Sequence, residues 1–313
     1  MSFFQSEIYY NLLKGLPGLE PFIFRGQEPA GNHVNWVTGI RHYNTGSIKR
    51  LFTSRVIIIG EPSFLSLSTT ELSRRTDWQF RKQTEGSCIY TELRLLEPPK
   101  DSGSIALLPY SFIHHYLNIF IDTTLSAELL FSGISVSKRR QVQSSLNAGA
   151  IVRQAGSEEE VKIFYQITRE LYRKKIKKPL ISEEVFLRLF RDKDAGVVLV
   201  VIFNDNIVGG MLCPYFEKDE MYEWYIAGQD DEMKMHKVYP SVLVTWEAIR
   251  FASASGFRRF NFMGAGISGR QYGARDFKMQ FGGELVDAPR YIFVHKPLLY
   301  KLGKLAIRLG LGN

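Results

Sequence analysis

The feature that most constrains the fold is a pair of long apolar runs in the second half of the chain, joined by a short polar turn. The runs are Gly196–Phe203 and Ile207–Phe216, and Asn204-Asp205-Asn206 lies between them. Runs of this length suit β-strands and fall far short of the ~20 residues of a spanning helix. A turn of Asn and Asp residues between two such runs is typical of a β-hairpin, which the sequence therefore predicts here.

Two helix-start signals precede this hairpin. Ser157 followed by three glutamates begins a helix running to about Lys175, and Ser182 with two glutamates begins another that ends near Arg191. Further strands are expected at 151–154, 220–227, 258–263 and in a pair near 284–294, further helices at 239–255 and 275–281, and a glycine-rich loop at 264–269. This order of elements is the one expected of an N-acyltransferase (GNAT-like) domain.

The first half mixes strands and helices as well, so the expected class is α+β, with α/β character. Helices are expected at 3–13 and 69–84, and strands at 21–25, 33–43, 56–60, 88–96 and 117–122. Because 313 residues exceed what one core usually fills, we expect two domains.

Composition narrows the class of protein. Apolar residues make up 45% and charged residues 23%, as in soluble globular proteins. The net charge of +8 and pI near 9.3 favour an anionic partner such as tRNA, a nucleotide, a phosphorylated cofactor or an acidic membrane surface. Cys88 and Cys213 are expected to be reduced and buried, and the N-terminus has no secretory signal, so the expected location is cytoplasmic. Neither cysteine has metal-ligand spacing to a histidine, so no metal site is expected.

The segment that most suggests chemistry is Asp276-Phe277-Lys278, which follows glycines 264 and 266. We expect Lys278 in the first turn of a helix, where a cation is electrostatically unfavourable unless it meets a phosphate or a developing oxyanion. The alternative is a solvated lysine beside a Phe277 that belongs to the core. The residues alone favour neither.

Several segments resemble the FemABX-like aminoacyltransferases and related GNAT-type acyltransferases. FNFMGAGISGRQYGARDFKMQFGGELVDAPRYIF resembles the C-terminal signature of that family, and SVSKRRQVQSSLNAGAIVRQAGSEEEVKIFYQI resembles the basic hairpin that leads into its second domain. EMYEWYIAGQ and YPSVLVTWEAIRFASASG resemble its central strand and the following helix, and FFQSEIYYNLL resembles its opening helix. The likeness is strong over 135–295 and weaker before.

The resemblance implies two tandem GNAT-like domains that pass an amino acid from aminoacyl-tRNA to an amine, usually on a peptidoglycan precursor. It implies a degenerate, acceptor-side domain at 1–135, a catalytic domain at 136–295 and an amphipathic helix at 296–313 that packs back on the first domain. Lys278 would steady the tetrahedral intermediate or a tRNA phosphate, and Phe277 would shape the pocket.

The candidate acceptor-binding residues are Glu223, Trp224 and Tyr225 on the expected central strand, together with Lys14 and Glu97. Tyr225 or Glu223 could orient the attacking amine. Family members that act on nucleotide-linked precursors carry a lysine where this chain has Asn11, and Lys14 lies three residues on. They also carry an aspartate near the position of Leu96 and Glu97. The acceptor could therefore differ from a muropeptide.

The candidate donor-binding residues are Gly264, Gly266, Lys138, Arg139, Arg140 and Lys237. The basic run 138–140, with Arg153, could contact a tRNA backbone, or it could form an exposed helical face. Acetyl-CoA-binding relatives carry a glycine-rich loop before the helix expected at 239–255, and this chain has none there. We therefore expect aminoacyl-tRNA as donor, with acyl-CoA as the alternative and no tightly bound cofactor.

Three functions stay open at this stage. The first is an aminoacyltransferase that acts on an anionic cell-envelope precursor, the second a CoA-dependent N-acyltransferase on an envelope or exopolysaccharide precursor, and the third a non-catalytic protein that binds RNA or a partner. The basic amphipathic stretch from Pro297 to Leu309 could also contact the inner face of an anionic membrane.

Overall fold

The computed structural model describes residues 2–27, 34–43, 53–62, 88–100 and 110–308. The helix expected at 69–84 lies outside these residues. The chain divides into two compact units: Met1–Tyr116 together with Asp287–Asn313 form unit 1, and Leu117–Val286 form unit 2. These bounds differ from the expected 1–135 and 136–295, because the strand after Tyr116 belongs to the sheet of unit 2 and the strand at 290–294 to the sheet of unit 1.

Unit 2 is built on a mixed sheet whose strand order is β13-β6-β12-β10-β9-β8-β7, with β11 paired to β9. The predicted hairpin is confirmed: β8 and β9 pair antiparallel, and Asn204 and Asp205 adopt φ angles of 48° and 60° in the turn. The strands are β6 (Tyr116–Asp122), β7 (Ile151–Gln154), β8 (Gly196–Phe203), β9 (Asn206–Phe216), β10 (Glu220–Tyr222), β11 (Tyr225–Gly228), β12 (Arg259–Ile267) and β13 (Glu284–Asp287).

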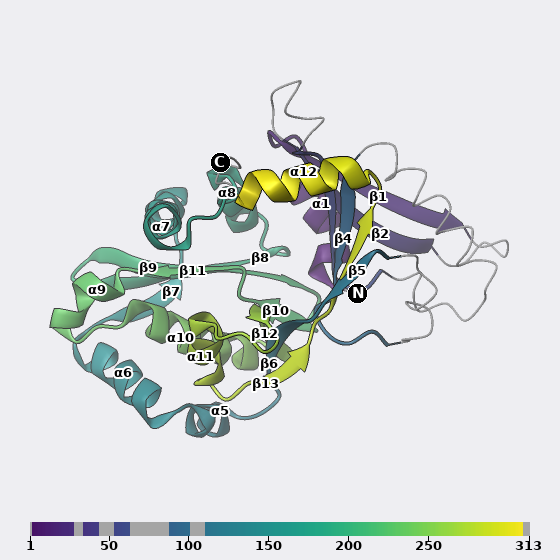
Figure 1. Ribbon diagram of the computed structural model, residues 1–313. Coiled ribbons are helices and arrows are strands. Elements are labelled where there is room, and N and C mark those ends of the chain that lie inside the picture. Colours follow the sequence, from purple (N-terminus) through teal and green to yellow (C-terminus); the bar gives the residue numbers. More distant parts are fainter. Residues whose placement is uncertain (1, 28–33, 44–52, 63–87, 101–109, 309–313) are drawn as a thin grey trace. The chain divides into compact units, whose positions relative to one another are not determined.

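Helices cover both faces of this sheet, with α7 and α8 on one side and α5, α6 and α10 on the other (Figure 1). Two neighbouring glycines of β9 allow a helix to pack closely on each face of the sheet. The missing Cβ of Gly209 would meet Pro240 of α10, and that of Gly210 would meet Phe164 of α7. The helices are α5 (Ala127–Gly133), α6 (Val136–Asn147), α7 (Glu158–Leu171), α8 (Glu183–Arg191), α9 (Asp230–Met233), α10 (Pro240–Ala254) and α11 (Gly273–Met279), with a π-helical turn η3 (Tyr172–Ile176) and a 3₁₀ turn η4 (Lys234–His236).

Two expectations for unit 2 are wrong. The basic segment at 135–147 is the helix α6, which begins at an N-cap Ser135, instead of a hairpin. The strand expected at 220–227 is interrupted at Glu223 and Trp224, where its first part pairs with β12 and its second part does not. The expectation of a hairpin at 135–147 came from the resemblance, not from the residues themselves, which form a capped helix. The interruption at Glu223 and Trp224 was missed because strand periodicity does not report which strand is the partner.

Unit 1 holds a second mixed sheet in the order β1-β2-β3-β4-β14-β5. The side chain of Gln5 ties the N-terminal turn to it, accepting from the Thr38 amide at 3.0 Å and donating to the Ile59 carbonyl at 2.6 Å. The elements are η1 (Phe3–Gln5), α1 (Glu7–Leu13), β1 (Leu19–Gln27), β2 (Val34–His42), β3 (Arg55–Ile59), β4 (Tyr90–Arg94), β5 (Phe112–His114), β14 (Arg290–Val294) and α12 (Pro297–Arg308).

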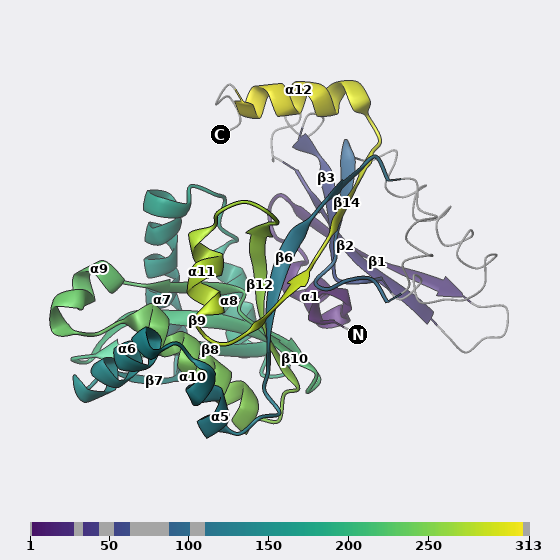
Figure 2. The ribbon, with the colours of Figure 1, turned by 60° about the horizontal axis from the view of Figure 1, so that its bottom comes forward.

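The strands at 284–294 do not form a single pair. β13 completes the sheet of unit 2, and β14 lies between β4 and β5 of unit 1. Figure 2 shows α12, in yellow, following β14 as a separate helix. Its Tyr300 ring packs on those of Tyr90 and Phe112 in unit 1. Within the described residues, no helix is long and apolar enough to cross a membrane.

Candidate active site

The sheet of unit 2 splits where β10 ends. β10 runs parallel to β12 as far as the pair Tyr222 and Asn261, and the Glu223 amide still donates to the Asn261 carbonyl at 2.9 Å. The next amide, of Trp224, donates instead to the Leu212 carbonyl of β9, and β11 continues along β9. We call this place, 222–225 and the facing 261–264 of β12, the strand fork. A split between strands leaves backbone groups and space for other side chains to fill.

Lys278 of α11 fills the fork. Its Nζ lies 3.1 Å from Oε1 of Glu223 and donates to the Phe262 carbonyl at 2.5 Å and the Gly264 carbonyl at 3.4 Å. Only 12% of the Lys278 side chain and 3% of the Glu223 side chain are exposed. An ammonium has three N–H donors, so this lysine has an acceptor for each of them.

Glu223 keeps a second carboxylate oxygen with unused capacity. Its Oε2 is buried and accepts no hydrogen bond from the residues that the structure describes. Burial raises the pKa of Glu223, while the nearby Lys278 acts to lower it. Burial also raises the pKa of the Cys213 thiol, on which the Glu223 charge acts in the same direction. A buried carboxylate oxygen without a partner is costly, and such groups concentrate where function needs them.

The β12 side of the fork is irregular and held by a buried asparagine. Asn261 Oδ1 accepts from the Met263 amide at 2.8 Å and from Nδ2 of Asn118 at 3.0 Å. Met263 adopts a φ of 58°, a conformation that non-glycine residues rarely take and that is found at functional sites. The glycines expected in a loop continue β12 to Ile267. Gly266 must be glycine because the Tyr272 ring would lie 2.7 Å from its Cβ.

Aromatic side chains surround the β11 side. The Tyr225 ring lies 5.5 Å from Trp224, 5.9 Å from Tyr172 and 5.4 Å from Phe186 between ring centroids. Burial raises the pKa of Tyr172 to about 12. Tyr172 begins a π-helical turn, a feature often found at functional sites. Tyr225 therefore contributes to a ring cluster, whereas Glu223 contacts the lysine.

The position of Lys278 within its helix corrects the expectation. α11 begins at Gly273, after Tyr272, and Lys278 lies in its last turn. A cation there complements the helix dipole, so the argument from an unfavourable first-turn lysine does not hold. Its burial against Glu223 is the better reason to single it out. Phe277 packs on Phe281 with 5.3 Å between the rings, and the ammonium of Lys138 lies 4.7 Å above the Phe277 ring.

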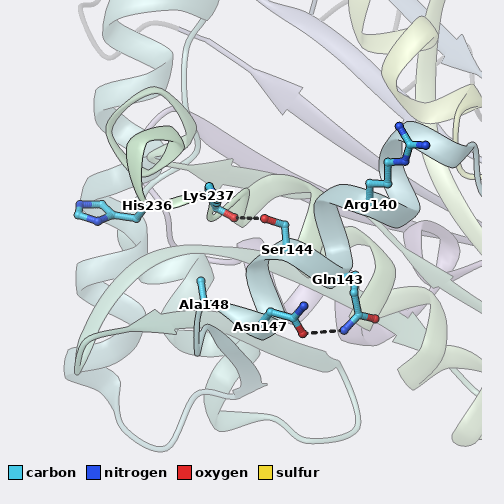
Figure 3. Close-up of a pocket in the computed structure, with 7 residues that line it drawn as sticks. All are labelled: Arg140, Gln143, Ser144, Asn147, Ala148, His236 and Lys237. Carbon is cyan, nitrogen blue, oxygen red and sulfur yellow. Dashed lines mark hydrogen bonds between the residues drawn. The ribbon is translucent and has the colours of Figure 1, made fainter.

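Two of the predicted donor-binding residues, Arg140 and Lys237, line a surface pocket, which we call the basic groove (Figure 3). Arg140 comes from α6 and Lys237 from the segment before α10, and both are exposed. Ser144 Oγ donates to the Lys237 carbonyl at 2.9 Å, and Ser145 Oγ accepts from the Tyr239 amide at 2.9 Å. The pocket has a volume of about 490 Å³ and is lined by Arg140, Gln143, Ser144, Asn147, Ala148, His236 and Lys237.

The other predicted cations lie elsewhere. Lys138 is half-buried over Phe277, and burial lowers its pKa, with a smaller opposing effect of Asp230. Arg139 is half-buried on α6, and Arg153 forms an ion pair with Glu160 at 2.6 Å. The run 138–140 therefore points in several directions, because successive residues of a helix face about 100° apart.

The N-terminus of α10 is already capped by a carboxylate. Asp230 accepts from the Ser241 amide at 3.1 Å and from the Ser241 hydroxyl at 2.5 Å. The missing Cβ of Gly228 would lie 2.8 Å from that hydroxyl, so the strand approaches the helix closely. Helix N-termini are natural anion sites, and this one is occupied by an anion of the chain itself.

The predicted acceptor residues Lys14 and Glu97 belong to unit 1. Lys14 is the exposed C-cap residue of α1, with its ammonium 5.8 Å from the centre of the Tyr10 ring, and Glu97 is half-buried after β4. Cys88 and Cys213 are buried cysteines that are not joined in a disulfide, one in each unit. Among the described residues, no three His, Cys, Asp or Glu side chains group as metal ligands.

A family model matches the part of the chain that contains the strand fork. The family model described as an acetyltransferase (GNAT) domain matches residues 137–279. Over this stretch the chain is similar to acetyltransferase (GNAT) domains. The stretch contains the strand fork, α11 up to Met279 and both sides of the basic groove. No curated protein sequence matches the chain.

Solved structures show the same fold over most of the chain. FemX matches at 12% identity with a TM-score of 0.71, covering 95% of this chain and 93% of its own. The C-terminal domain of a protein assigned as a lysylphosphatidylglycerol synthetase, from Agrobacterium fabrum, matches at 12% identity and 0.59, covering 92% and 88%. A tandem GNAT protein from the clavulanic acid biosynthesis pathway matches at 10% identity and 0.51, covering 92% and 87%. The expected α+β class with tandem GNAT-like units is confirmed.

Sequence reasoning missed several residues that the structure adds to the site. Asn118 and Asn261 hold the irregular end of β12, and the Glu223 charge acts on Cys213. Tyr172 packs on Tyr225, and Tyr272 lies against Gly266. The signal for Asn261 was an asparagine within an apolar strand, FNF, where burial requires a partner. The others are ordinary core or loop residues in sequence.

Proposed function

We propose that this chain is an aminoacyltransferase that moves an aminoacyl group from aminoacyl-tRNA to an amine of an anionic, peptidoglycan-like cell-envelope precursor, forming an amide. The observation that carries the proposal is the Glu223–Lys278 pair in the strand fork. It places a cation and a carboxylate oxygen without a hydrogen bond at the split of an acyltransferase sheet.

The two groups supply complementary steps. The nitrogen of a neutral amine attacks the ester carbonyl carbon, and the carbonyl oxygen becomes an oxyanion. Lys278 stabilises that oxyanion, and its longest hydrogen bond, 3.4 Å to Gly264, is the one that most readily turns toward it. Oε2 of Glu223 takes the proton from the attacking nitrogen, helped by a raised pKa, and returns it to the ribose oxygen as the ester bond breaks.

Aminoacyl-tRNA is favoured as donor over acyl-CoA. The Asp230 carboxylate engages the Ser241 amide at the N-terminus of α10, and the acidic residues Asp231 and Glu232 follow it. A CoA pyrophosphate placed there would meet like charge instead of free amides. The basic groove offers exposed cations from two elements to a polynucleotide backbone.

The test is a transfer assay with both donor classes. The protein is incubated with a pool of charged tRNA and, separately, with acyl-CoAs, with and without envelope precursors, and the loss of the acyl group is followed. We expect the charged tRNA, and not the acyl-CoAs, to lose its acyl group, and only when an acceptor is present. Transfer from acyl-CoA would contradict the donor, and deacylation of neither donor with any acceptor would contradict the enzyme.

A matched pair of variants ties the activity to the fork. Glu223→Gln should lower the transfer rate about 10²-fold, as expected when proton transfer by a positioned group is lost. Glu247→Gln is the control, because the Glu247 side chain is also largely buried, at 12% exposed, and is paired with a cation, Arg250, but lies on α10 away from the fork. Equal losses in both variants would assign Glu223 a purely structural role.

A further inference from the structure

The helix α12 presents an apolar stripe to solvent. Leu298 is 71% exposed, Leu302 50% and Leu305 53%. These residues stand at positions i, i+4 and i+7, which lie on one face of a helix. Large apolar side chains gathered on one exposed face are uncommon on a soluble surface and mark an interaction site.

The opposite side of α12 is the one that packs on unit 1. The Tyr300 ring lies 5.3 Å from Tyr90 and 6.0 Å from Phe112, and Gly303 is half-buried. The helix is therefore anchored through one face, and its leucine stripe is not the face that holds it to the protein. An amphipathic helix that buries its apolar face in its own core would show the reverse.

Cations flank the stripe on one side. Lys301 and Lys304 are exposed, and the Lys304 ammonium lies 4.9 Å above the Tyr300 ring. From Pro297 to Asn313 the sequence has no Asp or Glu. The exposed face thus combines apolar side chains with positive charge alone.

We propose that α12 docks this face on an anionic lipid surface. The helix would lie in the plane of the interface, with Leu298, Leu302 and Leu305 in the acyl boundary and the lysines at the headgroups. A second copy of the chain is a poorer occupant because two such faces carry like charge, and RNA is poorer because leucines offer nothing to phosphates. This inference does not depend on the proposed transfer reaction.

Vesicle sedimentation of the full chain tests the proposal. We expect binding to vesicles of phosphatidylglycerol and phosphatidylcholine, weakening as salt rises, and little binding to phosphatidylcholine alone. Leu298→Gln with Leu302→Gln should weaken binding by about tenfold or more, and Lys301→Gln by about fivefold. Absence of binding to the anionic vesicles, or equal binding to neutral ones, would overturn the proposal.

A matched control distinguishes binding through the leucine stripe from non-specific binding of exposed apolar side chains. Leu129 of α5 is 59% exposed and belongs to unit 2, so Leu129→Gln should leave vesicle binding unchanged. Size measurements and competition with RNA complete the test. A dimer that the leucine double variant dissociates, with no vesicle binding, would assign the face to a second copy. Binding to RNA that the same variant abolishes, again without vesicle binding, would assign it to RNA.

Discussion

The strand fork and the basic groove both contain lysines singled out in the sequence, but these lysines differ in burial and in their partners. Lys278 is 12% exposed and contacts a carboxylate and two carbonyls, whereas Arg140 and Lys237 are exposed and, in the described part of the chain, have no ion-pair partner. A buried charge acts strongly at short range, and an exposed one acts weakly at long range. The fork is therefore suited to stabilising the charge that develops on a single substrate atom, and the groove is suited to holding a large polyanion.

The largest effect is expected from Lys278→Ala. The change removes the proposed oxyanion donor, which costs about 10²–10³ in rate. It also leaves Glu223 buried without its cation, which destabilises the fold by about 3–5 kcal/mol. Transfer kinetics and urea unfolding measure the two losses. Full activity in this variant would remove the role of the lysine.

The double variant Lys278→Met with Glu223→Gln separates chemistry from stability. Replacing both charges of a buried pair with neutral side chains of similar size is often close to neutral, so the unfolding free energy should recover to within about 1–2 kcal/mol of wild type. The transfer rate should stay about 10²-fold low because both proposed groups are gone. Recovery of activity together with stability would show that the pair serves only the fold.

Changes in the groove should act on binding alone. Arg140→Ala and Lys237→Ala should each lower the slope of log affinity for tRNA against log salt by about 1, with wild-type stability and an unchanged rate at saturating tRNA. Binding measured at several salt concentrations gives the slope. Arg250→Ala, at an exposed guanidinium on α10, serves as the control. A salt slope that does not change would exclude the groove as the tRNA contact.

The smallest effect concerns a pair of intermediate exposure. Arg153, with the Gly156 amide, holds the pKa of Glu160 down at about 2, and the Glu160 side chain is 23% exposed. Because this pKa is below its ordinary 4.5, the stabilisation is present above that pH and is lost as the pH falls toward about 2. Glu160→Gln should therefore cost about 1 kcal/mol near neutral pH, after allowance for solvent screening, and progressively less in acid. A cost that does not change with pH would contradict the ion pair.

Local signals predicted most elements of unit 2. The hairpin at 196–216 and the capped start of the helix at Glu158 follow from turn residues and N-caps that act within a few residues. The split between Tyr222 and Tyr225 could not be predicted, because the apolar pattern continues through it and only the partner strand changes. The centre of the proposed site is therefore the place where a locally regular strand departs from its neighbour.

For the site residues too, the sequence indicated single positions but not the contact between them. Phe277 and Lys278 were singled out by the glycines and expected helix start around them and then by a resemblance, and Glu223 by its place on the expected strand. Nothing local indicated that Lys278 and Glu223 would touch. Their contact needs α11 to begin at Gly273, which turns Lys278 toward the fork from the last turn of the helix. When the start of a helix is predicted two residues off, the expected direction of each side chain changes by about 200°. The type of an element is therefore easier to predict from sequence than the directions of its side chains.

The place of β14 between β4 and β5 sets an order of events during synthesis. Most strands of the sheet of unit 1 are synthesised before unit 2, but this sheet lacks a middle strand until residues 290–294 emerge. At ~5–20 residues per second, β4 waits ~10–40 s for this neighbour. Unit 2 is complete in sequence before then, so the sheet of unit 1 can close only after unit 2 has been synthesised, and until then one edge of β4 lacks its neighbouring strand.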